Sequence, residues 1–516
     1  MTVQLPAARL APAALIISLI AACGPLTSLG GDSLVRPKEV SAQSLQRSQM
    51  DERVRAFYAA RDWRPAWSPS SAAQLQDAFK TLDRHAIDSK PFVARLAARD
   101  PLGREVALTK AALAYGDALA HGLIDPSKVF EVYGLERNDL NVDRTLAAAL
   151  SAGDLEPWLK SLAPNDPEYD RLSKAYLGYL KDAASRQPAA IPPGEAIKPG
   201  DQDRRIPQIV AALVAGRYLK EAPASSDRYE PAVVEAIKRF QTQQGVNDDG
   251  VIGGDTIAIL NAGPADRAHQ LALNLEVRRW LKRSPAATRI DVNTAAAVMT
   301  TYENGKIIDV RRVVVGKPDA ATPNLAGTFS DLVLNPPWNV PQGIAEREIL
   351  PKGAAYLREH DMYVDEGRVV QRPGPKASLG RVKFDMQNPH AIYLHDTPSK
   401  RAFAANERHG SHGCVRVDDA VGYARGLSSA AGVQSEFDAK LAKGSTAVLG
   451  LQTPMPVRLM YQTAFVDRSG EIAFRPDIYG WDERLATALG MPAPMKRVGA
   501  RFRRACCARS RCPAGG

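Results

Sequence analysis

Ile392-Tyr393-Leu394-His395 and Cys414-Val415-Arg416-Val417 are two short runs in which apolar and polar side chains alternate. Such alternation is typical of a β-strand that buries one face, because successive side chains point to opposite sides. The apolar residues of both runs are therefore expected in a core, and the polar residues on the other face. If the two strands pair side by side, His395 and Cys414 emerge close together.

The surrounding sequence predicts a β-rich domain over residues 288–450. Short strand-like segments, separated by turn residues such as Asn304-Gly305, begin near Ile290. A more helical stretch interrupts this pattern, so an insertion at about 343–385 is expected to form a lid that excludes water. Residues 451–495 are expected to form a C-terminal extension.

Cys414 is the candidate nucleophile, because it is the single cysteine inside the predicted folded body. The other cysteines lie near the two ends of the chain: Cys23, Cys506, Cys507 and Cys512. A free thiol, with a pKa of ~8.5, is mostly protonated at neutral pH, and a neighbouring imidazolium stabilises the thiolate. His395 is therefore the candidate general base, and it can later return the proton to a leaving amine.

The turn before the nucleophile, Ser411-His412-Gly413, is expected to aim backbone groups at the reaction centre. Glycine permits a close backbone approach, so the amides of Gly413 and Cys414 are candidates to stabilise a developing oxyanion. A guanidinium on the face of the cysteine suits a substrate carboxylate. The candidate substrate-binding residues are Arg416, Tyr393 and Trp338.

The start of the chain predicts export to the periplasm or cell envelope. Arg9 precedes an apolar run from Ala11 to Ala22 that is too short to span a bilayer as a mature helix. Residues 1–23 are therefore interpreted as a signal peptide, and residues 24–50 as a tether. The run ends Ile20-Ala21-Ala22-Cys23-Gly24, which resembles the lipobox of bacterial prolipoproteins. That resemblance implies lipidation of Cys23, with an ordinary cleavage site as the alternative.

Two helical modules are predicted before the β-rich domain. Residues 51–185 contain Ala-rich helical stretches broken at glycine and proline. The proline and glycine density of residues 186–204 excludes a regular helix and predicts a linker. A small module follows over 205–263, where Pro231 suits a first helical turn and apolar residues recur at helical spacing after it.

The formal net charge of +10 is concentrated at the C-terminus. Residues 496–516 carry seven positive charges and no acidic residue: Lys496, Arg497, Arg501, Arg503, Arg504, Arg509 and Arg511. Because the remaining body is nearly neutral, no nucleic-acid partner is expected. The basic tail itself is expected to be a disordered end.

Two motifs resemble known families. The run Tyr393 to Pro398, followed by Ser411 to Arg416, resembles the signature of the YkuD-type L,D-transpeptidase domain. Phe240-Gln241 followed by Asp249 to Gly253 resembles the peptidoglycan-binding domain of three short helices. Together with the helical N-terminal part, they resemble the large multidomain periplasmic L,D-transpeptidases. The implied fold class is multidomain α+β: a helical scaffold domain, a small three-helix peptidoglycan-binding domain and a β-rich catalytic domain with a helical lid insertion.

The resemblance implies a nucleophilic Cys414, a His395 base and a supporting role for His412, beside Ser411 and Gly413 of the same motif. It also implies a cysteine thioester that an amine of a second peptidoglycan stem peptide resolves, which gives a cross-link between third residues. No cofactor or metal is expected. Many family members carry Asn where Arg416 stands here, so an Asn-specific contact is not expected.

Three alternatives remain open from the sequence. Zinc is one, because His395, His409, His412 and Cys414 are four possible ligands at close spacing. A second is a lipid-anchored, non-catalytic peptidoglycan-binding scaffold. A third is an L,D-carboxypeptidase or hydrolase, in which water takes the place of the acceptor amine. Peptidoglycan stem peptides are the expected partner, and the membrane is expected to be contacted only through a lipid anchor.

Overall fold

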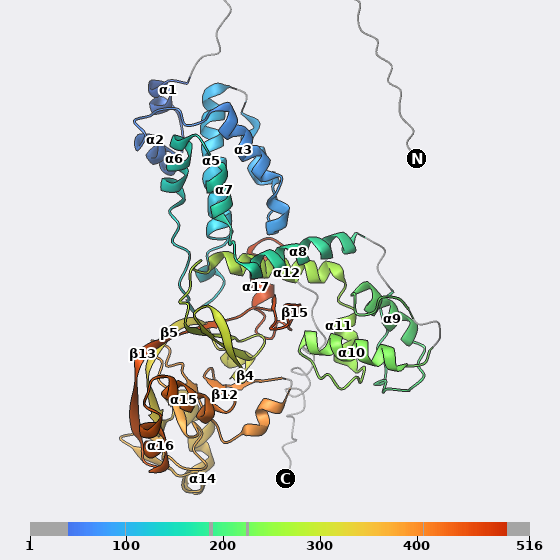
Figure 1. Ribbon diagram of the computed structural model, residues 1–516, viewed down its shortest axis with the longest axis vertical. Helices are drawn as coiled ribbons and strands as arrows, with labels where there is room; N and C mark the ends of the chain where they lie inside the picture. The colour runs from blue at the N-terminus through green and yellow to red at the C-terminus, as the bar shows by residue number, and fades with distance from the viewer. Residues whose placement is uncertain (1–39, 99, 185–188, 223–226, 406, 493–516) are drawn as a thin grey trace, which may run out of the picture.

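The computed structural model describes residues 40–98, 100–184, 189–222, 227–405 and 407–492. The predicted signal peptide with Cys23 and the predicted basic tail lie outside these residues. The molecule is elongated: N-terminal helices form one end, a small helical module forms a side lobe, and a β-sheet forms the other end (Figure 1). Within the described ranges, no helix combines the length and the apolar character needed to cross a membrane.

The N-terminal domain is built from helices, as predicted. Its α-helices are α1 (Ala42–Arg47), α2 (Glu52–Ala59), α3 (Pro69–Phe79), α4 (Lys90–Ala94), α5 (Pro101–Ala120), α6 (Val142–Ala152) and α7 (Glu156–Leu162). α5 is Ala-rich and buried along most of its length, and the side chain of Asp100 caps its first turn. The predicted tether over 24–50 is too long at its end, because Leu45 of α1 is fully buried in the core of this domain.

The side lobe contains α9 (Ile206–Ala215), α10 (Pro231–Gln244) and α11 (Gly254–Leu260). Gln241 of α10 explains why glutamine follows phenylalanine in this motif. Its Nε2 donates to the carbonyl of Val251 at 2.8 Å, and its Oε1 accepts the amide of Gly250 at 3.0 Å. The buried amide thus holds the turn that follows the helix, while Phe240 fills the core.

The predicted linker over 186–204 is packed in its described part. Ile191 and Ile197 are buried in the core of the side lobe, and Ile197 forms an isolated β-bridge with Ile252. Asn261 exchanges two hydrogen bonds with the backbone of Ile191, at 2.8 and 2.9 Å. The prolines exclude helix, as expected, but these isoleucines bury apolar surface and bind the segment to the module.

Two helices, α8 (Pro167–Ala183) and α12 (Pro264–Trp280), lie side by side across the middle of the molecule (Figure 1). Glu276 of α12 is fully buried and accepts the amides of Leu123 and Ile124, which follow α5, at 2.6 and 3.0 Å. Arg279, also fully buried, donates to Glu276 at 2.5 Å and to the carbonyl of His85 at 2.7 Å. This ion pair joins the N-terminal domain to the central helices.

The end of the molecule opposite the N-terminal helices is one large sheet with the order β1-β5-β13-β2-β3-β4-β12-β10-β9. The strands are β1 (Tyr133–Gly134), β2 (Arg289–Asn293), β3 (Val298–Glu303), β4 (Lys306–Gly316), β5 (Asn324–Leu334), β9 (Val382–Phe384), β10 (Leu394–His395), β12 (Val415–Val417) and β13 (Ala447–Met460), with β11 (His409–Ser411) paired to β4. Because β9 also pairs with β5, the sheet closes on itself. Helices α15 (Ala420–Ala430) and α16 (Gln434–Ala442) contribute Tyr423 and Phe437 to its core.

The predicted end of the catalytic domain at residue 450 is too early, because β13 continues to Met460. Its second half pairs with both β2 and β5, so residues 451–460 belong to the sheet. The following segment contains β14 (Ala464–Val466), β15 (Ile472–Phe474) and α17 (Trp481–Ala488). This C-terminal extension packs on the central helices: Thr463 accepts a hydrogen bond from Asn274 of α12 at 2.8 Å.

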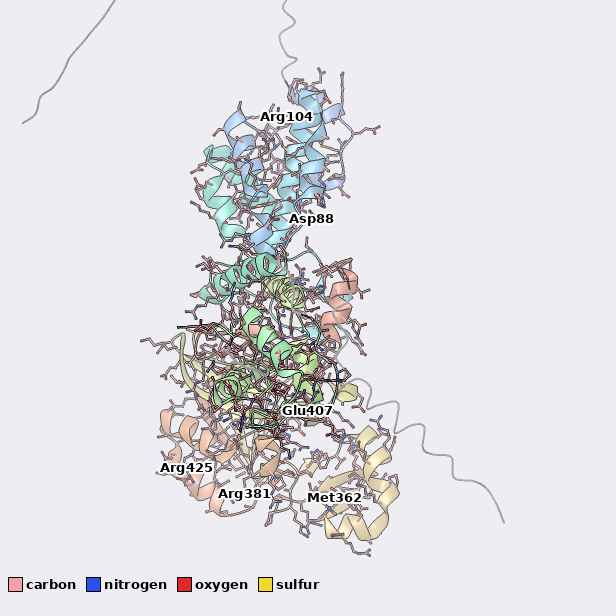
Figure 2. All side chains as sticks on the ribbon, turned by 90° about the vertical axis from the view of Figure 1, so that its right-hand side faces the viewer. Asp88, Arg104, Met362, Arg381, Glu407 and Arg425 are labelled. Atoms are coloured by element: carbon pink, nitrogen blue, oxygen red, sulfur yellow. The ribbon has the colours of Figure 1, made fainter. Side chains whose placement is uncertain are left out.

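The insertion has a small core of its own. It contains β6 (Trp338–Asn339), α13 (Gln342–Ile344), a π-helical turn (Ala345–Ile349), α14 (Gly353–Glu359), β7 (Met362–Asp365) and β8 (Arg368–Gln371). Figure 2 shows the region around Met362 as a lobe set apart from the region around Arg425. The predicted insertion end at 385 is late, because β9 already belongs to the main sheet.

Candidate active site

The structure places the two decisive runs on neighbouring parallel strands. β10 pairs with β12, with Leu394 opposite Val415 and His395 opposite Arg416. Leu394 and Val415 are fully buried in the core of the sheet. In a parallel pair, residues at the same level point to the same face, so His395, Arg416 and Cys414 share the face away from this core.

His395 is almost fully buried and is prepared to act as a base. Its Nδ1 lies 2.5 Å from the carbonyl oxygen of Asp396. A carbonyl oxygen can only accept, so Nδ1 carries the hydrogen and Nε2 keeps its lone pair. Burial, assisted by the positive charge of Arg416, lowers the pKa of His395 to about 3. The imidazole is therefore neutral at physiological pH.

Cys414 is half-buried and is a protonated thiol at rest. Burial raises the pKa of the Cys414 thiol, and this effect outweighs the opposing hydrogen bonds from Tyr393 and the positive charges of Lys383 and Arg416. Within the described chain, its Sγ makes a contact of 3.8 Å with the carbonyl oxygen of Ala391 rather than a hydrogen bond with His395. At rest the site therefore holds a neutral Cys414 thiol and a neutral His395 imidazole, and not the expected thiolate and imidazolium.

Ser411 and Gly413 shape the turn in front of the nucleophile. The buried Ser411 hydroxyl donates to the carbonyl of Cys414 at 2.6 Å and accepts the amide of Gly413 at 3.1 Å. Gly413 has φ +112°, a conformation that side chains disfavour. The predicted oxyanion role of the Gly413 amide therefore needs correction, because this N–H is already engaged. Among the described residues the Cys414 amide has no acceptor, so it is the group left for an oxyanion.

His412 connects the turn to the insertion. Its Nε2 lies 2.8 Å from Oε1 of Glu348, and Lys317 Nζ lies 3.9 Å from the same oxygen. The hydrogen bond from His412 lowers the pKa of Glu348. Sequence reasoning did not find Glu348, because it lies 64 residues before His412 within an insertion that was predicted only as a lid.

Arg416 is half-buried beside Cys414 and has no hydrogen-bond or ion-pair partner in the part of the chain that the structure describes. Its Nε is buried, and burial lowers the pKa of the guanidinium. Arg416 lines a pocket of about 280 Å³ together with Glu407, Arg408 and His409, and this pocket lies beside the Cys414–His395 pair without being lined by it. An uncompensated cation next to the nucleophile suits a substrate carboxylate.

Of the other two predicted substrate contacts, Tyr393 lies beside His395 and Cys414, and Trp338 lies beside Tyr393. The ring of Tyr393 is 5.6 Å from the ring of His395 and inclined to it at 64°, and Lys383 Nζ lies 4.5 Å from the Tyr393 ring centre. Burial raises the pKa of the Tyr393 phenol well above its ordinary value. Trp338, on β6 of the insertion, lies close enough to this phenol to oppose the rise in its pKa.

The possible zinc ligands have separate partners. His395 bonds to Asp396, His412 bonds to Glu348, and His409 Nε2 lies 3.0 Å from the carbonyl of Thr294. Across the described ranges, no group of three or more His, Cys, Asp or Glu side chains is arranged to hold a metal ion.

Comparisons with known proteins match three segments of the chain. Residues 287–427 match the YkuD family, described as the L,D-transpeptidase catalytic domain. Residues 52–177 match a scaffold domain, and residues 206–260 match a peptidoglycan binding domain. A Haemophilus influenzae protein with the curated name "Putative L,D-transpeptidase" is 33% identical over 223 residues. That match covers 39% of this chain and 45% of the relative, so the chain spans less than half of the relative's length.

Several solved structures are also similar in part. L,D-transpeptidase 3 from Mycobacterium tuberculosis is 12% identical, with a TM-score of 0.20 over 34% of this chain and 61% of the other. A mutant L,D-transpeptidase from Enterococcus faecium is 13% identical, with a TM-score of 0.20 over 35% of this chain and 52% of the other. These TM-scores are too low for the whole chains to superpose. The three matched segments show that the chain combines a scaffold domain, a peptidoglycan-binding domain and an L,D-transpeptidase catalytic domain of the YkuD family.

Proposed function

We propose that the chain is a peptidoglycan L,D-transpeptidase that forms cross-links between the third residues of stem peptides through a cysteine thioester. The observation that carries the proposal is the placement of Cys414 and His395 on one face of two adjacent parallel strands, beside an unengaged Cys414 amide. The match of residues 287–427 to the catalytic-domain family supports it.

In the first half-reaction, Sγ of Cys414 attacks the carbonyl of the third residue of a donor stem, and a C–S bond forms. The thiol proton moves to Nε2 of His395, whose lone pair is kept free by the hydrogen bond of Nδ1. The Cys414 amide donates to the oxyanion. Collapse breaks the amide bond, and His395 returns the proton to the departing D-alanine amine, which leaves a thioester.

In the second half-reaction, a side-chain amine of another stem attacks the thioester carbonyl. His395 accepts a proton from the amine, the C–S bond breaks, and the thiol is restored. Arg416 binds a carboxylate of the stem, for which its unpartnered guanidinium is suited. The insertion, fastened to the motif through Glu348 and His412, excludes water and so favours the amine over hydrolysis.

The proposal places the protein in the cell envelope, where its polymeric substrate lies. The lipobox-like run that ends at Cys23 supports a lipid anchor there. Mass spectrometry of the mature N-terminal peptide tests the anchor: a lipidated Cys23 is expected, and an unmodified N-terminus at another residue would refute it.

Mass spectrometry of muropeptides, after incubation with the purified protein, tests the proposed reaction. Cross-linked product that has lost one D-alanine is expected, and Cys414→Ala should form none. Tripeptides without cross-links would identify a carboxypeptidase instead. If Cys414→Ala formed as much product as the unmodified chain, the thioester mechanism would be refuted; binding without any product would identify a scaffold.

A further inference from the structure

A buried group of hydrogen bonds lies directly behind the nucleophile turn. The hydroxyl of Thr322 donates to the carbonyl oxygen of Gly413 at 2.7 Å and accepts the amide of Gly316 at 2.9 Å. Tyr479, from the C-terminal extension, donates to the carbonyl of Gly316 at 2.8 Å and accepts the amide of Thr322 at 3.4 Å. Thr322 is fully buried. The hydrogen bond from the Tyr479 hydroxyl to Gly316 is buried as well.

The Gly413 carbonyl belongs to the same peptide unit as the Cys414 amide. A trans peptide is planar, and its C=O and N–H groups point in opposite directions. Holding the Gly413 oxygen on one side therefore fixes the direction of the Cys414 N–H on the other. This N–H is the donor that remains available for an oxyanion. It stabilises the oxyanion best when its direction is already fixed before the reaction begins.

We propose that Thr322 is the positioning residue of the oxyanion-stabilising peptide, with Tyr479 of the C-terminal extension holding Thr322 in place. The inference rests on the proposed acyl transfer. It gives the extension a role in catalysis, because a residue beyond the sheet anchors the loop that carries Thr322. Neither residue touches the substrate.

Local packing leaves little freedom for this arrangement to shift. A Cβ atom on Gly316 would lie 2.2 Å from the carbonyl oxygen of Ala320 and 2.6 Å from the amide nitrogen of Thr322. The backbone of this loop thus closes tightly around the hydroxyl. A valine at position 322 would fill the same space but could neither donate to Gly413 nor accept from Gly316.

A comparison of two reactions of Cys414 shows whether Thr322 orients the oxyanion donor or instead supports the cysteine in general. Acylation by a donor tetrapeptide passes through an oxyanion, whereas alkylation by iodoacetamide displaces iodide at carbon and forms none. Both rates are measured on the full-length protein, by D-alanine release and by the mass of the peptide that contains Cys414. The variants are Thr322→Val, Thr322→Ser and Thr301→Val. Thr301 is a matched control, since its buried hydroxyl, on strand β3 of the same domain, bonds to Tyr423 at 2.9 Å.

We expect Thr322→Val to slow acylation roughly 10- to 100-fold, a part of the loss seen when an oxyanion donor is removed outright. Its alkylation rate should stay within about twofold, and Thr322→Ser should keep acylation within about threefold because the hydroxyl is restored. Thr301→Val should change neither rate. Equal acylation by Thr322→Val and Thr301→Val, or a parallel loss of alkylation in Thr322→Val, would overturn the inference. Absence of acylation in the unmodified protein would instead refute the proposed function, and this inference with it.

Discussion

The pH dependence of Cys414 alkylation tests whether the catalytic pair rests as thiol and imidazole. Burial lowers the pKa of His395 to about 3 and raises that of Cys414 above its ordinary value. The imidazole of His395 is therefore a much weaker base than the thiolate of Cys414, so internal proton transfer to form the imidazolium–thiolate pair is unfavourable. At pH 7 the thiolate fraction is then below about 3%.

Iodoacetamide should therefore alkylate Cys414 at a rate that rises about tenfold per pH unit from pH 5 to pH 9. The rate is followed by mass spectrometry of the peptide that contains Cys414, so that the other cysteines do not interfere. A thiolate held by imidazolium would behave differently, because its alkylation would already be fast at pH 5. A rate plateau between pH 5 and pH 8 would refute the neutral pair.

His395→Gln supplies the matched control for this assay. The imidazole contributes its lone pair during attack and does not stabilise a resting thiolate, so the alkylation profile of His395→Gln should stay close to that of the unmodified protein. Acyl transfer by the same variant should fall by roughly 10²- to 10⁴-fold, the usual contribution of a positioned base. An alkylation profile that shifts strongly in this variant would contradict the assignment.

Three further predictions follow from single contacts. Arg416→Gln should raise KM for the donor stem about tenfold or more, since a hydrogen bond to a charged group contributes about 1.5–3 kcal/mol, and an unchanged KM would exclude carboxylate binding by Arg416. Glu348→Ala should lower kcat/KM about two- to fivefold, as expected for the loss of one partly exposed hydrogen bond to a carboxylate, whereas Glu346→Ala on the same turn should have no effect; equal values for the two would remove Glu348 from the site. Glu276→Ala should destabilise the protein by about 3–5 kcal/mol in urea unfolding, because Arg279 would be left buried without its carboxylate, and an unchanged midpoint would refute this.

The faces of the catalytic strands could be predicted because alternation is a local property. Ile392 and Leu394 alternate with Tyr393 and His395, and the buried side of each strand follows from that pattern alone. Pairing with the strand of Cys414 was only a condition of the prediction, because burial of both apolar faces does not determine which strands are neighbours. The direction of a single peptide group is not encoded locally, which is why the Gly413 amide was assigned to the oxyanion although Ser411 already accepts its hydrogen.

The residues that support the site were missed for a related reason. Thr322 acts across 91 residues of sequence and Tyr479 across 157, and neither belongs to a periodic pattern or to a motif. The predicted domain bounds were wrong where the composition of a segment suggested a linker or a domain end but its side chains are buried or its strand continues. Ile191 and Ile197 pack a proline-rich segment into a core, and one long strand carries the sheet past residue 450.

The side lobe is connected to the rest of the molecule by only a few structural elements. Helix α12 continues the chain from the lobe toward the sheet. In addition, Arg475 of the C-terminal extension donates a hydrogen bond to the carbonyl of Gln243 in the lobe at 2.6 Å. A helix of this length measures about 25 Å, comparable to the size of a small domain. In the proposed function, a glycan strand gripped by the lobe would thus be presented at a set spacing from the sulfur. The protein would then select among neighbouring stems by their distance from the bound glycan strand as well as by their chemistry.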